Sequence, residues 1–99
     1  MAENCNSLEK VREHIDGLDR QIVRLIAERG LYVSQAARFK KDCEAVKAPQ
    51  RVEQIIAKMK SLAVEINANP IVIEDVYRAM IAAFIEQELE EHGALNRSF

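Results

Sequence analysis

Residues 8–40 read LEKVREHIDGLDRQIVRLIAERGLYVSQAARFK, and this stretch decides the fold. Its core-facing positions recur at steps of three or four residues, which is the spacing of one face of an α-helix. The stripe consists of Leu8, Val11, Ile15, Leu18, Ile22, Leu25, Arg29, Val33, Ala36 and Lys40. Two internal glycines each cost about 1 kcal/mol relative to alanine without forcing a break. The pattern predicts one helix that starts at Asn6, with a capping box formed by Asn6 and Glu9, and continues to about Asp42.

The length of this helix bears on the oligomeric state. A helix of about 36 residues is a rod of roughly 54 Å at 1.5 Å per residue. A compact domain of 100 residues has a radius of gyration of only about 13 Å. The rest of the chain is too short to cover such a rod. We therefore expect the stripe to be buried against a second copy of the chain, in a homodimer.

Two further helices follow, and strand signals are missing. Pro49 suits the first position of a helix, and Asn69 followed by Pro70 gives a cap and a first residue for another. Their apolar stripes run through Val52, Ile55, Ile56, Met59, Leu62 and Ile66, and through Val76, Tyr77, Met80, Ile81, Phe84, Ile85 and Glu88. Gly93 is expected to end the last helix, which leaves 94–99 as a loose tail. The fold class is all-α, with three helices per chain and a very long first helix.

Composition narrows the function classes. The 99 residues are expected to form a single domain, 1–99, and 14 basic against 16 acidic side chains give a net charge of −2. That balance argues against a nucleic-acid binder. No apolar run is long enough to span a membrane, and no signal-type stretch opens the chain, so we expect a cytoplasmic protein. Cys5 and Cys43 lack metal-ligand spacing and are expected to be reduced thiols.

Charged residues occupy positions where a core residue is expected. Arg29 and Lys40 lie on the first stripe eleven residues apart, which is three helical turns. Arg12 shares a face with that stripe, Arg51 begins the inner side of the second helix, and Glu88 continues the buried side of the third. Burying a lone cation costs several kcal/mol unless something pairs with it. The surplus of positive charge predicts a pocket for a small anionic ligand.

A purely structural interpretation stands beside this one. Long Arg and Lys side chains often lie along a helix flank with their charged ends in water, and Asp19 could pair with Arg12. The joint occurrence of Arg29, Lys40 and Glu88 on stripe positions favours the ligand pocket. No His/Cys/Asp cluster has metal-ligand spacing, and no phosphate loop or Ser-His-Asp order is present, so no metal and no cofactor is expected.

Three segments together resemble the all-helical chorismate mutases, a family that includes isochorismate pyruvate lyase as a sister activity. Residues 11–40 carry an R-x-x-I-D-x-L-D opening, the A-E-R of 27–29 and a closing lysine, as the first helix of that family does. APQRVEQII at 48–56 is similar to the start of its second helix, and VYRAMIAAFIEQEL at 76–89 to its third.

This resemblance implies an intertwined homodimer with two pockets, each built from both chains, that hold a small-molecule dicarboxylate. Arg12 would reach in from the partner subunit and clamp one substrate carboxylate. Arg29 would hold the enolpyruvyl carboxylate, and Arg51 would support the pocket from the second helix. Val33 and Ile85 would line its walls.

The resemblance also implies the chemistry. Chorismate becomes prephenate by an intramolecular rearrangement in which one C–O bond breaks while a C–C bond forms. Lys40 would donate to the ether oxygen, where negative charge grows, and Glu88 would lie opposite it and donate when protonated. Together with Arg29 these are the expected catalytic residues, and orientation of the substrate supplies the rest.

One departure leaves the substrate open. Many mutases carry Glu directly after the second-helix arginine, where it holds the ring hydroxyl. Here that place is Val52, as in the lyases, and Glu53 lies one step on, about 100° around the helix. The sequence favours chorismate mutase. The alternatives are isochorismate pyruvate lyase, a non-catalytic helical dimer or regulatory binding module, and an unrelated coiled coil, which would not need Arg29 and Lys40 on its seam.

Overall fold

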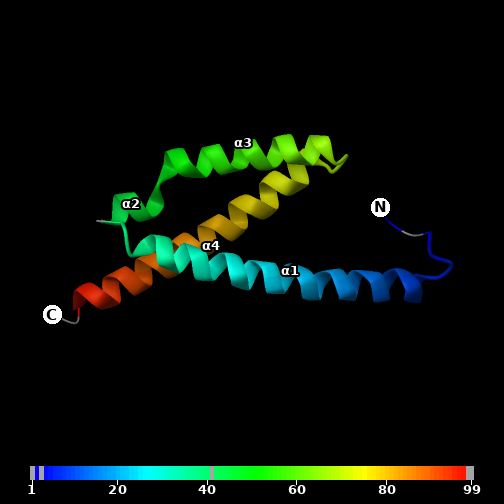
Figure 1. The fold of residues 1–99 in the computed structure, drawn as a ribbon, viewed down its shortest axis with the longest axis horizontal. Helices are drawn as coiled ribbons and strands as arrows, with labels where there is room; N and C mark the ends of the chain where they lie inside the picture. The colour runs from blue at the N-terminus through cyan, green and yellow to red at the C-terminus, as the bar shows by residue number, and fades with distance from the viewer. Residues whose placement is uncertain (1, 3, 41, 98–99) are drawn as a thin grey trace. The chain divides into compact units, whose positions relative to one another are not determined.

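The computed structural model describes residues 2, 4–40 and 42–97, with side chains at 43, 44 and 92–97 left out. It contains the helices α1 (Leu8–Ala37), α2 (Cys43–Lys47), α3 (Pro49–Glu65) and α4 (Pro70–Arg97), which Figure 1 labels. No strand occurs in the part of the chain that the structure describes. The predicted all-α class and its three long helices are confirmed. The short α2 was not predicted.

The chain divides into two compact units, 1–33 and 34–99. The first unit is essentially one helix. Its N-terminus is capped by Ser7, whose Oγ accepts a hydrogen bond of 3.2 Å from the Lys10 amide. The predicted cap at Asn6 was therefore wrong by one residue. All residues of α1 are described, and none of them is buried. The apolar side chains of α1 are therefore not buried within one chain, and the homodimer stays a prediction.

The C-terminal end of α1 differs from the prediction. The helix ends at Ala37 rather than near Asp42, so it has 30 residues. Three successive amides then bond to carbonyls three residues back, the last of them from Lys40 to Ala37 at 3.1 Å. These tight turns close the helix end without a glycine or a proline. Lys40 consequently lies just beyond the helix and not on its stripe.

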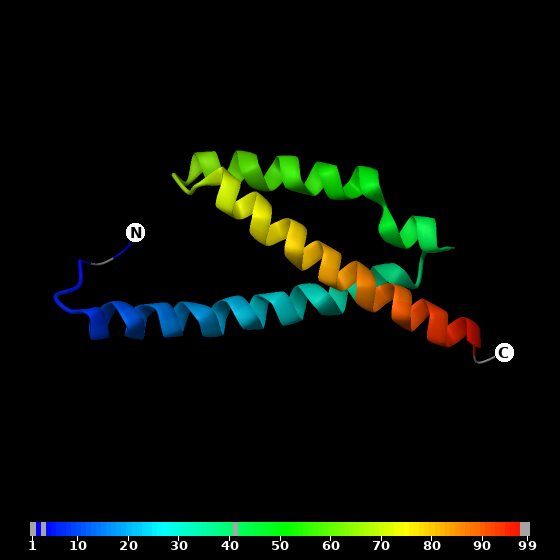
Figure 2. The same ribbon diagram turned by 180° about the vertical axis from the view of Figure 1, so that it is seen from behind.

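The second unit is built on a hairpin of α3 and α4, which Figures 1 and 2 show as two arms that leave a common turn. Pro49 opens α3, and Asn69 caps α4 by accepting 2.9 Å from the Ile71 amide through its side-chain oxygen. Both predicted starts are confirmed. Asn67 turns the chain in the left-handed region at φ 60°. The buried apolar residues of this unit are Val46, Ile56, Ala63 and Ile81.

The end of α4 lies later than predicted. Gly93 does not stop the helix, which continues to Arg97, so residues 94–97 are helical and not a loose tail. Positions 98 and 99, the rest of the predicted tail, lie outside the described residues. A single glycine costs only about 1 kcal/mol in a helix and does not by itself end one. In the described part of the chain, no helix is both long and apolar enough to cross a membrane.

Candidate functional site

The second unit contains an ion pair that joins two residues far apart in the sequence. Lys40 Nζ lies 3.0 Å from Glu88 Oε2. Glu88 is the one buried charged residue among those described, with 5% of its side chain exposed, whereas Lys40 keeps 24%. A carboxylate this deep needs a partner, because an unpaired buried charge costs several kcal/mol. The expected juxtaposition of these two residues is therefore present within one chain.

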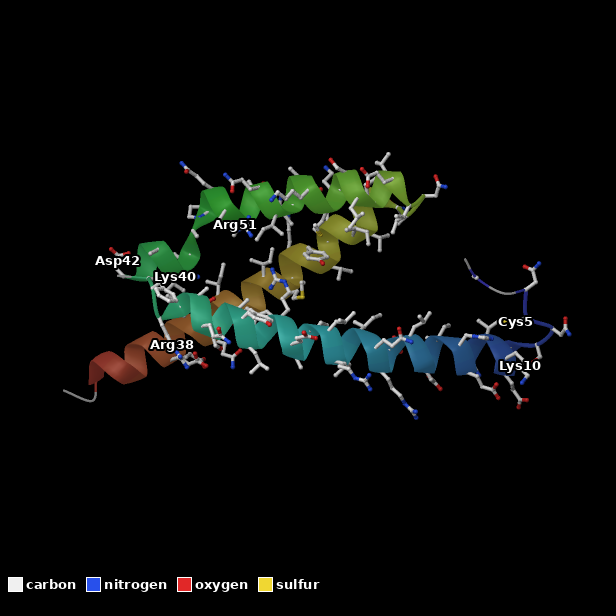
Figure 3. All side chains as sticks on the ribbon, viewed as in Figure 1. Cys5, Lys10, Arg38, Lys40, Asp42 and Arg51 are labelled. Atoms are coloured by element: carbon white, nitrogen blue, oxygen red, sulfur yellow. The ribbon has the colours of Figure 1, made fainter. Side chains whose placement is uncertain are left out.

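Local structure on both sides of Lys40 places it there. The tight turns after α1 end at Lys40. Asp42 caps α2, since its side-chain Oδ1 accepts 2.9 Å from the Ala45 amide and its carbonyl accepts 3.1 Å from the Val46 amide. Figure 3 labels Lys40 and Asp42 next to each other at the start of α2. Val46 of α2 keeps only 2% of its surface exposed, and α2 packs on α4, the helix that carries Glu88.

The start of α3 presents an apolar residue where a carboxylate is common in the mutases. Val52 is half-buried, and Arg51, labelled in Figure 3, is exposed in the single chain. Glu53 is turned to another partner. Its two carboxylate oxygens accept from Arg78 Nη1 and Nη2, each at 2.9 Å. This bidentate pair fixes direction as well as charge, and it holds the pKa of Glu53 below its ordinary value of 4.5.

Arg78 also binds within its own helix. Its Nε donates to Glu74 Oε2 at 2.8 Å, and Lys60 Nζ lies 3.1 Å from Glu74 Oε1. Both hydrogen bonds lower the pKa of Glu74, and the one from Arg78 has the larger effect. The carboxylates of Glu53 and Glu74 in turn raise the pKa of Arg78. This cluster was not predicted from the sequence. The Glu74–Arg78 spacing of four residues was a visible signal, but nothing in the sequence pointed from Arg78 to Glu53.

The other predicted site residues are distributed over both units. Ile85 is half-buried on α4, in the same unit as Lys40 and Glu88. Arg12, Arg29 and Val33 lie on the first unit, where Arg12 is exposed and the other two are half-buried. In the described part of the chain, no group of three or more His, Cys, Asp or Glu side chains could hold a metal ion.

Comparison with known proteins adds to this geometry. The sequence profile of the family described as chorismate mutase type II matches residues 11–89, a range that contains every predicted site residue. The isochorismate pyruvate lyase of Pseudomonas aeruginosa PAO1 is 31% identical over 88 residues, which cover 89% of this chain and 87% of the lyase. The chain therefore belongs to the chorismate mutase type II family.

Proposed function

We propose that the chain is an enzyme that cleaves the enolpyruvyl ether of isochorismate and releases pyruvate and salicylate. The observation that carries the proposal is the Lys40–Glu88 pair, in which a lysine ammonium is held at a buried carboxylate by a bond of 3.0 Å. In the proposed complex the Lys40 ammonium supplies a positive charge and a hydrogen-bond donor on one side of the substrate.

The reaction needs help at one atom. The bond from the ring carbon to the ether oxygen breaks, the oxygen becomes the keto oxygen of pyruvate, and a ring hydrogen moves to the enolpyruvyl methylene as the ring becomes aromatic. Negative charge grows on that oxygen while the bond breaks. In this proposal the ether oxygen replaces the Glu88 carboxylate as the acceptor of Lys40, and Glu88 donates to the same oxygen only after it takes up a proton from solvent. Loss of one such preorganised donor typically lowers the rate about 10² to 10³-fold.

The two substrate carboxylates need fixed cations, and the proposal assigns them to arginines of two chains. Arg29 and Arg51 come from one subunit and Arg12 from its partner. The dimer is supported by the stripe of α1, where Leu18 and Ile22 remain 55% and 51% exposed in the single chain. Covering apolar side chains of this size contributes about 1.5–3 kcal/mol for each one fully buried.

The choice of isochorismate rests on the start of α3. The carboxylate that would hold the ring hydroxyl of chorismate is missing, because Val52 occupies its place and Glu53 is bound by Arg78. The relative from Pseudomonas aeruginosa is named for lyase activity on isochorismate. Both facts favour the lyase reaction, whereas the mutase reaction was the expectation from the sequence.

Conversion of chorismate to prephenate is the second candidate. The match to the chorismate mutase type II profile favours it. The same cations would serve both reactions, since the ether oxygen gains charge in each. A third possibility, a binding module without catalysis, predicts no turnover of either substrate.

The test is a paired assay of the purified protein with isochorismate and with chorismate. Pyruvate release from isochorismate as the dominant reaction supports the proposal, and prephenate from chorismate as the dominant reaction replaces it with the second candidate. The variant Val52→Glu should then shift the ratio of the two kcat/KM values toward chorismate by about 10- to 100-fold, the worth of a hydrogen bond to a charged group. Val64→Glu, an exposed position on the same helix, is the matched control and should leave the ratio unchanged.

A further inference from the structure

The segment that joins α1 to α3 is attached to α4 at two places. The first is the ion pair of Lys40 with Glu88 at 3.0 Å. The second is apolar, because Val46 keeps only 2% of its surface exposed and α2 packs on α4. A helix of five residues is not stable alone in water, so α2 depends on this packing. Val46 is the apolar anchor of the segment.

The exit of the segment is strained. Ala48 has φ 36° and ψ 60°, in the left-handed region that costs a residue with a Cβ about 1–2 kcal/mol. It also precedes Pro49, and a following proline favours extended backbone instead. Strain of this kind persists only where the surroundings impose it. Ala48 lies between α3, which follows it, and α2, which is docked through Val46.

We propose that Val46 is a positioning residue for Lys40, an inference that rests on the proposed role of Lys40 at the ether oxygen. Lys40 lies outside the helices and carries a long, flexible side chain. The turns after α1 restrain its backbone on one side only. The docking of α2 through Val46 restrains the other side and thereby keeps the ammonium at Glu88.

The positioning itself is tested without any enzymatic activity. The lysines are acetylated with a limiting amount of reagent. The acetylation rate of Lys40 is then measured by mass spectrometry relative to that of the exposed Lys58. Val46→Ala should raise the relative rate of Lys40 about fivefold, as the loss of one hydrogen bond would. Glu88→Gln is the positive control. Ile56→Val is the matched control, because it also trims a buried side chain but lies on α3.

Equal rates of Lys40 in wild type, Val46→Ala and Ile56→Val would overturn the proposal. Circular dichroism under the same conditions verifies that each variant is folded. If Val46→Ala is not, the isosteric Val46→Thr takes its place with the same criterion.

Turnover then separates this inference from the proposed function. Val46→Ala should lower kcat about tenfold with little change in KM, because a small misplacement of a catalytic group costs rate. Val46→Ala should cause no further loss of kcat when it is added to Lys40→Met. If Val46 had only a structural role, its replacement would lower kcat by the same factor in wild type and in Lys40→Met. A raised labelling rate with unchanged kcat would uphold the positioning and refute the catalytic role of Lys40.

Discussion

Removal of the cation from the Lys40–Glu88 pair should destabilise the chain more than removal of the anion. Lys40→Met keeps the length of the side chain but leaves the Glu88 carboxylate, 5% exposed, without the ammonium. Breaking a fully buried pair in this way costs about 3–5 kcal/mol. Because Lys40 is 24% exposed, we expect a smaller loss of about 2 kcal/mol. Glu88→Gln leaves a lysine that can extend into water, so its cost should stay below about 1 kcal/mol.

The assay is urea unfolding followed by circular dichroism, with all variants at one protein concentration because dimerisation would make stability depend on it. The double variant Lys40→Met/Glu88→Gln should be more stable than Lys40→Met alone, since it removes the buried charge. The expected coupling energy is about 1–2 kcal/mol. Equal losses in the two single variants, adding without coupling, would show that Glu88 is not held by Lys40.

Three further outcomes are expected. Ala48→Gly should stabilise the chain by about 1 kcal/mol, measured by thermal unfolding, because glycine adopts positive φ without strain; a loss of stability would argue against the left-handed exit. Arg78→Met should be less stable than wild type above pH 4.5. The difference in stability should disappear as the pH falls through the lowered pKa values of Glu53 and Glu74, because carboxylates with lowered pKa contribute stability only while they are ionised. A difference in stability that persists in acid would contradict this. Ile22→Asp should yield monomers in analytical ultracentrifugation while wild type is a dimer, and a wild-type monomer would refute the interpretation of the α1 stripe.

The sequence was most informative where a local signal sets a backbone feature. Pro49 and the Asn69–Pro70 pair gave the starts of α3 and α4 because a cap and a fixed φ act within one turn. The ends of helices were predicted less well. Ala37 ends α1 through tight turns that need no special residue, and Gly93 costs too little to stop α4.

The candidate site could be predicted from the sequence only in part. Glu88 was recognised from its place on a buried stripe, and the structure places it there. Lys40 was assigned to the stripe of α1, but it reaches Glu88 from a turn beyond the helix. The docking of α2 through Val46 and the capture of Glu53 by Arg78 depend on contacts between distant segments, which periodicity does not encode. The roles of Arg12, Arg29 and Arg51 stay predictions.

The most direct test of the central claim is pyruvate release from isochorismate by wild type and by Lys40→Met, measured side by side at saturating and limiting substrate. The proposal predicts a clear wild-type rate and a loss of at least about 100-fold in the variant, the usual effect of removing a preorganised donor. A wild-type enzyme that releases pyruvate, with a Lys40→Met variant within about twofold of it, would show that Lys40 contributes almost no transition-state stabilisation and would contradict the claim.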